Sequence, residues 1–248
     1  MSATKIAIHE RQWEEMAHLD PLFAILTEKA KQFGRWDTEE FFASGRKEID
    51  ELMEARGFSK GDNGRALDFG CGVGRLSKAL RAYFGEVTGV DIAEGMIDLA
   101  RRHAPRCRFI LNRHEDLSLF ENDSFDFIYS NIVLQHQPTQ ILARRYIGEF
   151  IRIIKPRGII VFQMPYKLTL RYALQPKRRL YSLLRACGVS AEFLYNRLHL
   201  NPIRTICLET RDVQNTVARR NGTILRVYPD EFNHHSMSYV VTKAAKRN

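Results

Sequence analysis

The sequence predicts an α/β fold built on a mostly parallel sheet. An apolar run at residues 66–69 breaks into three glycines, and apolar residues then recur at helical spacing from residue 75 to 84. Further strand-like runs alternate with helical patterns as far as residue 164, the order expected when helices connect parallel strands. Two later strand-like runs, residues 222–228 and 238–242, are joined by a polar turn and indicate a closing hairpin.

The chain is long enough to bury one sizeable core, and its charge is concentrated in one part. It has 248 residues and a formal net charge of +9. Residues 144–220 carry 16 Lys and Arg against four Asp and Glu, a local excess of +12 that exceeds that of the whole chain. A field of this sign favours an anionic partner.

Cysteine usage and hydropathy indicate a cytoplasmic protein. The four cysteines form no C-x-x-C pair and have no histidine at metal-ligand spacing, so neither a metal site nor a disulfide framework is expected. The sequence shows no charged-then-apolar leader and no apolar run near 18 residues. We therefore expect no membrane span and a reducing compartment.

The first 62 residues are expected to form a helical extension. Asp20 and Pro21 suit the start of a helix over residues 22–33, and Gly34 suits its end. Two further helices are expected over residues 38–43 and 46–56. The aromatic side chains of this extension suit either a lid that lines a pocket or a helical layer packed on the sheet.

The glycines that end the first strand mark the expected ligand site. Gly70, Gly72 and Gly74 allow the backbone to turn tightly and to approach a ligand without a Cβ atom. Asp91 ends the next strand-like run, where a carboxylate can accept both ribose hydroxyls of an adenosine. The third glycine comes one residue earlier than in the dinucleotide fingerprint, and Asp68 stands beside the turn. Both features point away from a nicotinamide dehydrogenase, which remains the rival on fold alone.

The stretch from Leu67 to Gly74, together with Asp91, resembles the class I S-adenosylmethionine-dependent methyltransferases, and the resemblance extends loosely over the whole chain. It implies a Rossmann-like, seven-stranded, mostly parallel sheet with the C-terminal antiparallel hairpin, helices on both faces and a helical N-terminal extension. It also implies S-adenosyl-L-methionine as the cofactor. The cofactor-binding residues that it implies are Asp68, Gly70, Cys71, Gly72, Gly74, Asp91, Ile92, Met96, His114, Glu115 and Asn131.

Some of these assignments leave alternatives open. Met96 stands where related enzymes place a side chain against the adenine, but it equally suits the core. The acid that usually reads the adenine edge aligns with Arg113, so the backbone N–H of His114 and the carboxylate of Glu115 are the candidates instead. Asn131 follows the fourth strand and is expected near the sulfonium of the cofactor.

The predicted organisation is a single methyltransferase domain over residues 1–248. Residues 1–62 form the helical cap, residues 63–164 and 209–248 the core, and residues 165–208 a basic insertion. The insertion contains a basic amphipathic helix over residues 177–185, which either covers the core or forms a lid over the acceptor pocket. A turn at residues 155–158 is expected before the fifth strand.

Methyl transfer from a sulfonium depends mainly on positioning, and a base is needed only when the acceptor keeps its proton. His136, just beyond the fourth strand, is the candidate base, although a packing role also suits it. We expect methylation of a small, anionic acceptor, with oxygen favoured as the methylated atom. The alternatives are an RNA methyltransferase that uses the basic insertion, and a non-catalytic protein that binds S-adenosylmethionine.

Overall fold

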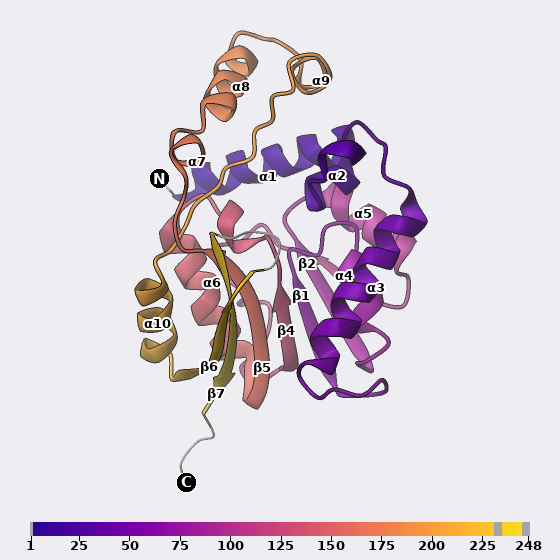
Figure 1. The fold of residues 1–248 in the computed structure, drawn as a ribbon, viewed down its shortest axis with the longest axis vertical. Helices are drawn as coiled ribbons and strands as arrows, with labels where there is room; N and C mark the ends of the chain where they lie inside the picture. The colour runs from indigo at the N-terminus through magenta and orange to yellow at the C-terminus, as the bar shows by residue number, and fades with distance from the viewer. Residues whose placement is uncertain (1, 231–234, 245–248) are drawn as a thin grey trace.

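The computed structural model describes residues 2–230 and 235–244 and contains one seven-stranded sheet. The strand order is β3-β2-β1-β4-β5-β7-β6, in which β1 to β5 pair in parallel and β7 runs antiparallel to β5 and β6 (Figure 1). This confirms the predicted fold class. The strands are β1 Arg65–Phe69, β2 Glu86–Asp91, β3 Arg108–Leu111, β4 Phe125–Ser130, β5 Ile154–Pro165, β6 Gly222–Pro229 and β7 Ser236–Lys243.

Helices cover both faces of the sheet. The strand residues alternate between the faces, so that Ile128 packs in one core while Phe127 and Tyr129 pack in the other. The first core is closed by α6 and α10, and the second by α3 and α4. The helices around the sheet are α3 Thr38–Glu54, α4 Arg75–Leu80, α5 Glu94–His103, α6 Gln140–Ile153 and α10 Thr210–Arg219.

The remaining helices lie beyond the carboxyl ends of the parallel strands. α1 crosses that end of the sheet beside α2, while α7, α8 and α9 project beyond α1 (Figure 1). None of the helices in the described part of the chain is both long and apolar enough to cross a membrane. These elements are α1 Ser2–Leu19, α2 Pro21–Ile25, the 3-10 helices η1 Lys29–Lys31 and η2 Leu134–His136, α7 Leu170–Leu174, α8 Pro176–Ala186 and α9 Ala191–Asn196.

The expected helix over residues 22–33 is wrong, because the chain leaves the helix at Leu26. Leu26 is extended, and its carbonyl accepts a hydrogen bond from Trp36 Nε1 at 3.1 Å. Asp20 precedes Pro21 as predicted, but its carboxylate caps no helix and instead accepts from the backbone N–H groups of Phe33 and Gly34. Long-range hydrogen bonds thus replace the last turns of the expected helix.

Two other expected boundaries are also wrong. The helices expected over 38–43 and 46–56 form the single helix α3. Gly45, which lies between the two expected ranges, does not end a helix but lets α3 pack closely against Arg75, because a Cβ there would lie 2.7 Å from Arg75 Cγ. The turn expected at residues 155–158 is a bulge within β5, where Arg157 has φ +66° and the register with β7 shifts.

Candidate functional site

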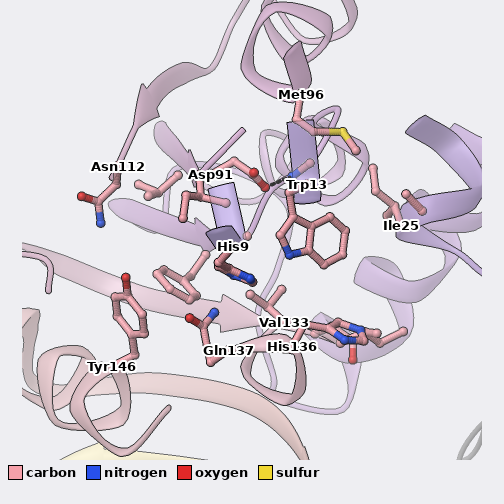
Figure 2. Close-up of a pocket in the computed structure, with 18 residues that line it drawn as sticks. His9, Trp13, Ile25, Asp91, Met96, Asn112, Val133, His136, Gln137 and Tyr146 are labelled. Atoms are coloured by element: carbon pink, nitrogen blue, oxygen red, sulfur yellow. Dashed lines mark hydrogen bonds between the residues drawn. The ribbon is translucent and has the colours of Figure 1, made fainter. Parts of the chain in front are cut away.

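A pocket opens at the carboxyl ends of β1, β2 and β4, beneath α1 and α2 (Figure 2). In parallel α/β sheets this edge is where ligands bind. The sheet side of the pocket consists of Phe69, Gly70, Gly72, Val90, Asp91, Ile92, Met96, Asn112, Asn131, Ile132 and Val133. The other side consists of His9, Trp13, Ala24, Ile25, His136, Gln137 and Tyr146.

The glycine turn and Asp91 meet in this pocket, as the sequence predicts. Gly72 has φ +50° and its N–H donates to Asp91 Oδ2 at 2.9 Å, while Ala93 N–H donates to Asp91 Oδ1 at 3.0 Å. Burial raises the pKa of the Asp91 carboxyl, and these backbone donors act in the opposite direction. The two hydrogen bonds therefore fix the carboxylate at the tip of β2.

Space at the turn is too small for side chains. A Cβ on Gly70 would lie 2.3 Å from Val133 Cγ2, and one on Gly72 would lie 2.4 Å from Ile25 Cδ1. Both residues also have positive φ, which L side chains rarely adopt. The bare backbone of the turn thus faces the pocket.

The structure brings six of the eleven predicted cofactor residues to the pocket and leaves five outside its lining. Met96, 1% exposed, lines the pocket and also packs in the core, and its position against an adenine stays a prediction. The six are Gly70, Gly72, Asp91, Ile92, Met96 and Asn131. The five outside the lining are Asp68, Cys71, Gly74, His114 and Glu115.

Asp68 supports the turn from below. Its buried carboxylate accepts a hydrogen bond from Ser77 Oγ at 2.6 Å and thereby joins β1 to α4. Burial raises the pKa of Asp68 to about 6, although the hydrogen bond from Ser77 and the nearby Arg75 oppose this shift. Cys71 is buried between the turn and α5, and Gly74, with φ +83°, precedes α4.

The loop after β3 is ordered by its own hydrogen bonds. Asn112 Oδ1 accepts from the His114 N–H at 3.1 Å, and Asn112 Nδ2 donates to the Asp116 carbonyl at 2.9 Å. Glu115 pairs with Arg145 at 2.6 Å. The residue of this loop that lines the pocket is therefore Asn112, rather than the predicted His114 or Glu115.

Asn131 follows the end of β4 and is held there by hydrogen bonds around Glu48. Asn131 Nδ2 donates to Glu48 Oε1 at 2.8 Å, and Tyr129 donates to the same oxygen. Glu48 Oε2 accepts from Arg75, whose side chain is 4% exposed, at 2.7 Å. This part-buried ion pair holds Glu48, which in turn fixes the Asn131 amide at the pocket edge.

His136 lines the pocket and is held in a neutral form. Its Nδ1 lies 2.6 Å from the Arg204 carbonyl and must donate to it, which leaves Nε2 as the acceptor, 3.1 Å from Gln135 Nε2. Its ring contacts Trp13 edge-on, with centroids 5.6 Å apart (Figure 2). Burial lowers the pKa of His136 to about 4, so the imidazole is uncharged at neutral pH.

His9 and Trp13 are pocket residues that the motifs do not identify. Both come from α1, and burial lowers the pKa of His9 to about 3, with His136 and Arg204 adding to the shift. The one signal in the sequence was the aromatic content of the N-terminal extension, which was compatible with a pocket-lining role.

No group of three or more His, Cys, Asp or Glu suited to hold a metal ion occurs among residues 2–230 and 235–244. The polar side chains that line the pocket are one carboxylate, three amides, one phenol, one indole and two neutral imidazoles. Such a set suits hydrogen bonding to an organic ligand.

Comparison with known proteins places a family model on the centre of the chain. Residues 67–162 match the model described as "Methyltransferase domain". The chain is 33% identical over 135 residues to a ubiquinone biosynthesis O-methyltransferase of Coxiella burnetii, covering 53% of this chain and 51% of the relative. It is 31% identical over 135 residues to a demethylmenaquinone methyltransferase of Staphylococcus haemolyticus, covering 48% and 55%. The chain thus spans about half the length of these relatives.

Solved structures share the fold. The PH0226 protein of Pyrococcus horikoshii aligns with a TM-score of 0.58 at 22% identity, covering 84% of this chain and 92% of that one. Magnesium protoporphyrin IX methyltransferase of Synechocystis, solved with bound SAH, aligns with a TM-score of 0.55 at 20% identity, covering 86% and 91%. At these identities the alignments support the fold alone.

Proposed function

We propose that this chain, whose residues 67–162 belong to the class I S-adenosylmethionine-dependent methyltransferases, transfers a methyl group from S-adenosylmethionine to a small molecule held in the pocket under α1. The observation that carries the proposal is the convergence of the glycine turn, Asp91, Asn131 and two neutral histidines on one pocket. The turn and the carboxylate serve the cofactor, and the histidine side serves the acceptor.

The sheet side of the pocket fits the cofactor. The Asp91 carboxylate, held by two backbone donors, keeps acceptor capacity for the ribose hydroxyls. Gly70 and Gly72 present backbone without side chains, and Ile92 and Met96 offer apolar surface to the adenine. When bound, S-adenosylmethionine supplies an electrophilic methyl group on a sulfonium.

The acceptor side is built for positioning. Proximity and orientation alone remove roughly 7–11 kcal/mol from the barrier of a bimolecular displacement. His136 Nε2 accepts from Gln135 Nε2 at 3.1 Å, and an acceptor hydroxyl that displaces this amide would donate to the same lone pair of the neutral imidazole. A base with a pKa near 4 is weak, so His136 orients the hydroxyl more than it activates it.

Two arginines outside the pocket lining, Arg204 next to His136 and Arg178 near Arg204, favour an anionic acceptor. Arg204 donates from Nη1 to the Pro138 carbonyl at 3.1 Å and depresses the pKa of His9. Arg178 is close enough to Arg204 to be affected by its charge, and burial lowers the pKa of Arg178 as well. In the described part of the chain neither guanidinium forms an ion pair with a carboxylate, so both have unused capacity for a carboxylate or phosphate.

Oxygen is the favoured methyl acceptor. The two named relatives act in ubiquinone biosynthesis and on demethylmenaquinone, and the first is named an O-methyltransferase. A hydroxyl on an aromatic ring, next to an anionic substituent, suits both the imidazoles and the arginines. This substituent is what Arg178 and Arg204 would recognise.

Calorimetry tests the cofactor, and product analysis tests the reaction. We expect S-adenosylmethionine and S-adenosylhomocysteine to bind and NAD not to bind; the reverse would overturn the assignment. A panel of hydroxylated aromatics, with and without a carboxylate, is then screened for S-adenosylhomocysteine release. Arg204→Gln should raise the acceptor KM, while Arg179→Gln, at an exposed position, serves as the matched control. Cofactor binding without turnover on any acceptor would indicate a binding protein instead.

A further inference from the structure

We infer that the segment of residues 167–198, which includes α7, α8 and α9, is a docking surface for a membrane that contains anionic phospholipid. This segment, called the docking segment below, projects beyond α1 at the carboxyl end of the sheet (Figure 1). The inference goes beyond the proposed function, because it rests on the exterior of this segment and not on the pocket.

The docking segment exposes an unusual amount of apolar side chain. Of eleven large apolar residues that are exposed in the described part of the chain, seven lie in residues 170–198. Single exposed leucines are ordinary, but a concentration of this kind marks an interaction site. The seven are Leu170, Tyr172, Leu174, Leu180, Leu183, Phe193 and Leu198.

The exposed leucines of α8 are not needed for its packing. The buried side of α8 is formed by Tyr181, 3% exposed, and by Leu184, which pack with Leu194. Leu180 and Leu183, three residues apart on α8, are 46% and 62% exposed and belong to none of the buried clusters. The apolar surface of α8 therefore remains available for a partner.

The charge of the docking segment selects the partner. Residues 167–198 contain seven Lys and Arg and one acidic residue, Glu192. Lys177 and Arg179 are exposed on α8 beside Leu180. A short helix with leucines flanked by cations is the pattern of helices that lie in the interface of an anionic bilayer. A nucleic acid would use the cations but would gain little from exposed leucines.

The docking segment is also connected to α1, which forms the roof of the pocket together with α2. Glu15 on α1 accepts a hydrogen bond from Tyr181 at 2.6 Å and pairs with Arg185 at 2.8 Å. Trp13, two residues earlier on α1, lines the pocket. A membrane bound at the docking segment would therefore lie next to the elements that cover the acceptor side.

Vesicle co-sedimentation of the full chain tests the inference. We expect binding to vesicles of phosphatidylcholine with phosphatidylglycerol, weaker binding to phosphatidylcholine alone, and loss of binding at high salt. The double variant Leu180→Gln with Leu183→Gln should lower the partition coefficient roughly tenfold or more. Leu225→Gln, at an equally exposed position on β6, should bind as the wild type does.

Two results would overturn the inference. One is equal binding by the wild type and the α8 double variant, with unfolding midpoints and cofactor affinity showing that both are folded. The other is a stable dimer in size-exclusion chromatography that the double variant converts to a monomer, because a second copy would then be what covers these leucines. Failure of cofactor binding in the wild type would contradict the proposed function and leave the vesicle result unaffected.

Discussion

Replacing Asp91 by Asn tests the cofactor site directly. The carboxylate holds two backbone donors, Gly72 N–H at 2.9 Å and Ala93 N–H at 3.0 Å, and we propose that it also accepts the ribose hydroxyls. Each hydrogen bond to a charged acceptor contributes about 1.5–3 kcal/mol, and asparagine keeps one neutral acceptor oxygen. The expected loss of binding free energy is about 2–4 kcal/mol, which raises the Kd for S-adenosylhomocysteine about 30- to 1,000-fold.

The variant also has a cost in stability that must be measured separately. The amide turns an N–H group toward one of the two backbone donors, which leaves that donor unpaired at about 1–3 kcal/mol. In a chain of this size the unfolding midpoint should fall by about 2–12 °C. Titration calorimetry at 20 °C and pH 8, well above the ordinary range of a carboxyl whose pKa burial raises, therefore keeps the variant folded and the wild-type carboxylate ionised.

The matched control is Asp98→Asn, because Asp98 is a half-exposed carboxylate on α5 that pairs with Arg101 at 3.0 Å. We expect this variant to bind S-adenosylhomocysteine as the wild type does. An Asp91→Asn protein that binds within twofold of the wild type would refute the assignment of Asp91. Equal weakening by both variants would show that net charge, and not the ribose contact, is responsible.

Three further variants are expected to separate structure from binding. Gly72→Ala forces a side chain into φ +50° at about 1–2 kcal/mol and places its Cβ 2.4 Å from Ile25 Cδ1, so calorimetry of the folded variant should show weakened cofactor binding. Glu48→Gln removes the charge that pairs with Arg75 but keeps an acceptor oxygen, and urea unfolding should show a loss of about 1–3 kcal/mol. His136→Gln should flatten the pH dependence of stability: a folded pKa near 4 makes the wild type lose stability as pH falls from 6.5 to 4, by up to about 1.4 kcal/mol per pH unit.

The sheet could be predicted because its signals are local. Each strand from β1 to β5 is a short apolar run that ends at a turn or a polar residue, and each prediction came within a few residues of the observed bounds, apart from the β5 bulge. The extension could not be predicted in the same way. The break at Leu26 depends on a hydrogen bond from Trp36, and Gly45 looks like a helix boundary until Arg75 is seen packed against it. α1 has little hydrophobic periodicity, so the sequence predicted a helical extension there without the bounds of this helix.

The pocket residues likewise fall into those that sequence motifs identify and those that only the tertiary fold brings to the pocket. Gly72 and Asp91 carry a spacing that identifies them in the sequence, and the structure joins them by a hydrogen bond. His9 and Tyr146 carry no such signal, because nothing in the sequence shows that α1 crosses the sheet edge or that the middle of α6 reaches the loop after β3. Tyr146 donates to the His114 carbonyl at 2.8 Å across 32 residues. Contacts of this range follow from the tertiary fold and cannot be read from periodicity.

The two sides of the pocket are held by different parts of the chain, and this separation has a functional meaning. The side proposed to bind the cofactor is fixed by β1, β2 and their hydrogen bonds within residues 67–162. The roof is fixed from the insertion: Tyr195 donates to the buried Asp20 at 2.9 Å, and Tyr181 and Arg185 bind Glu15. The covering residues of α1 and α2 lie outside the matched family region, whereas His136, Gln137 and Tyr146 on the same side of the pocket lie within it. Under the proposed function, we expect changes in α1 and the insertion to alter acceptor choice while the proposed cofactor residues stay the same. Contact of the insertion with a membrane would then act on the acceptor side first.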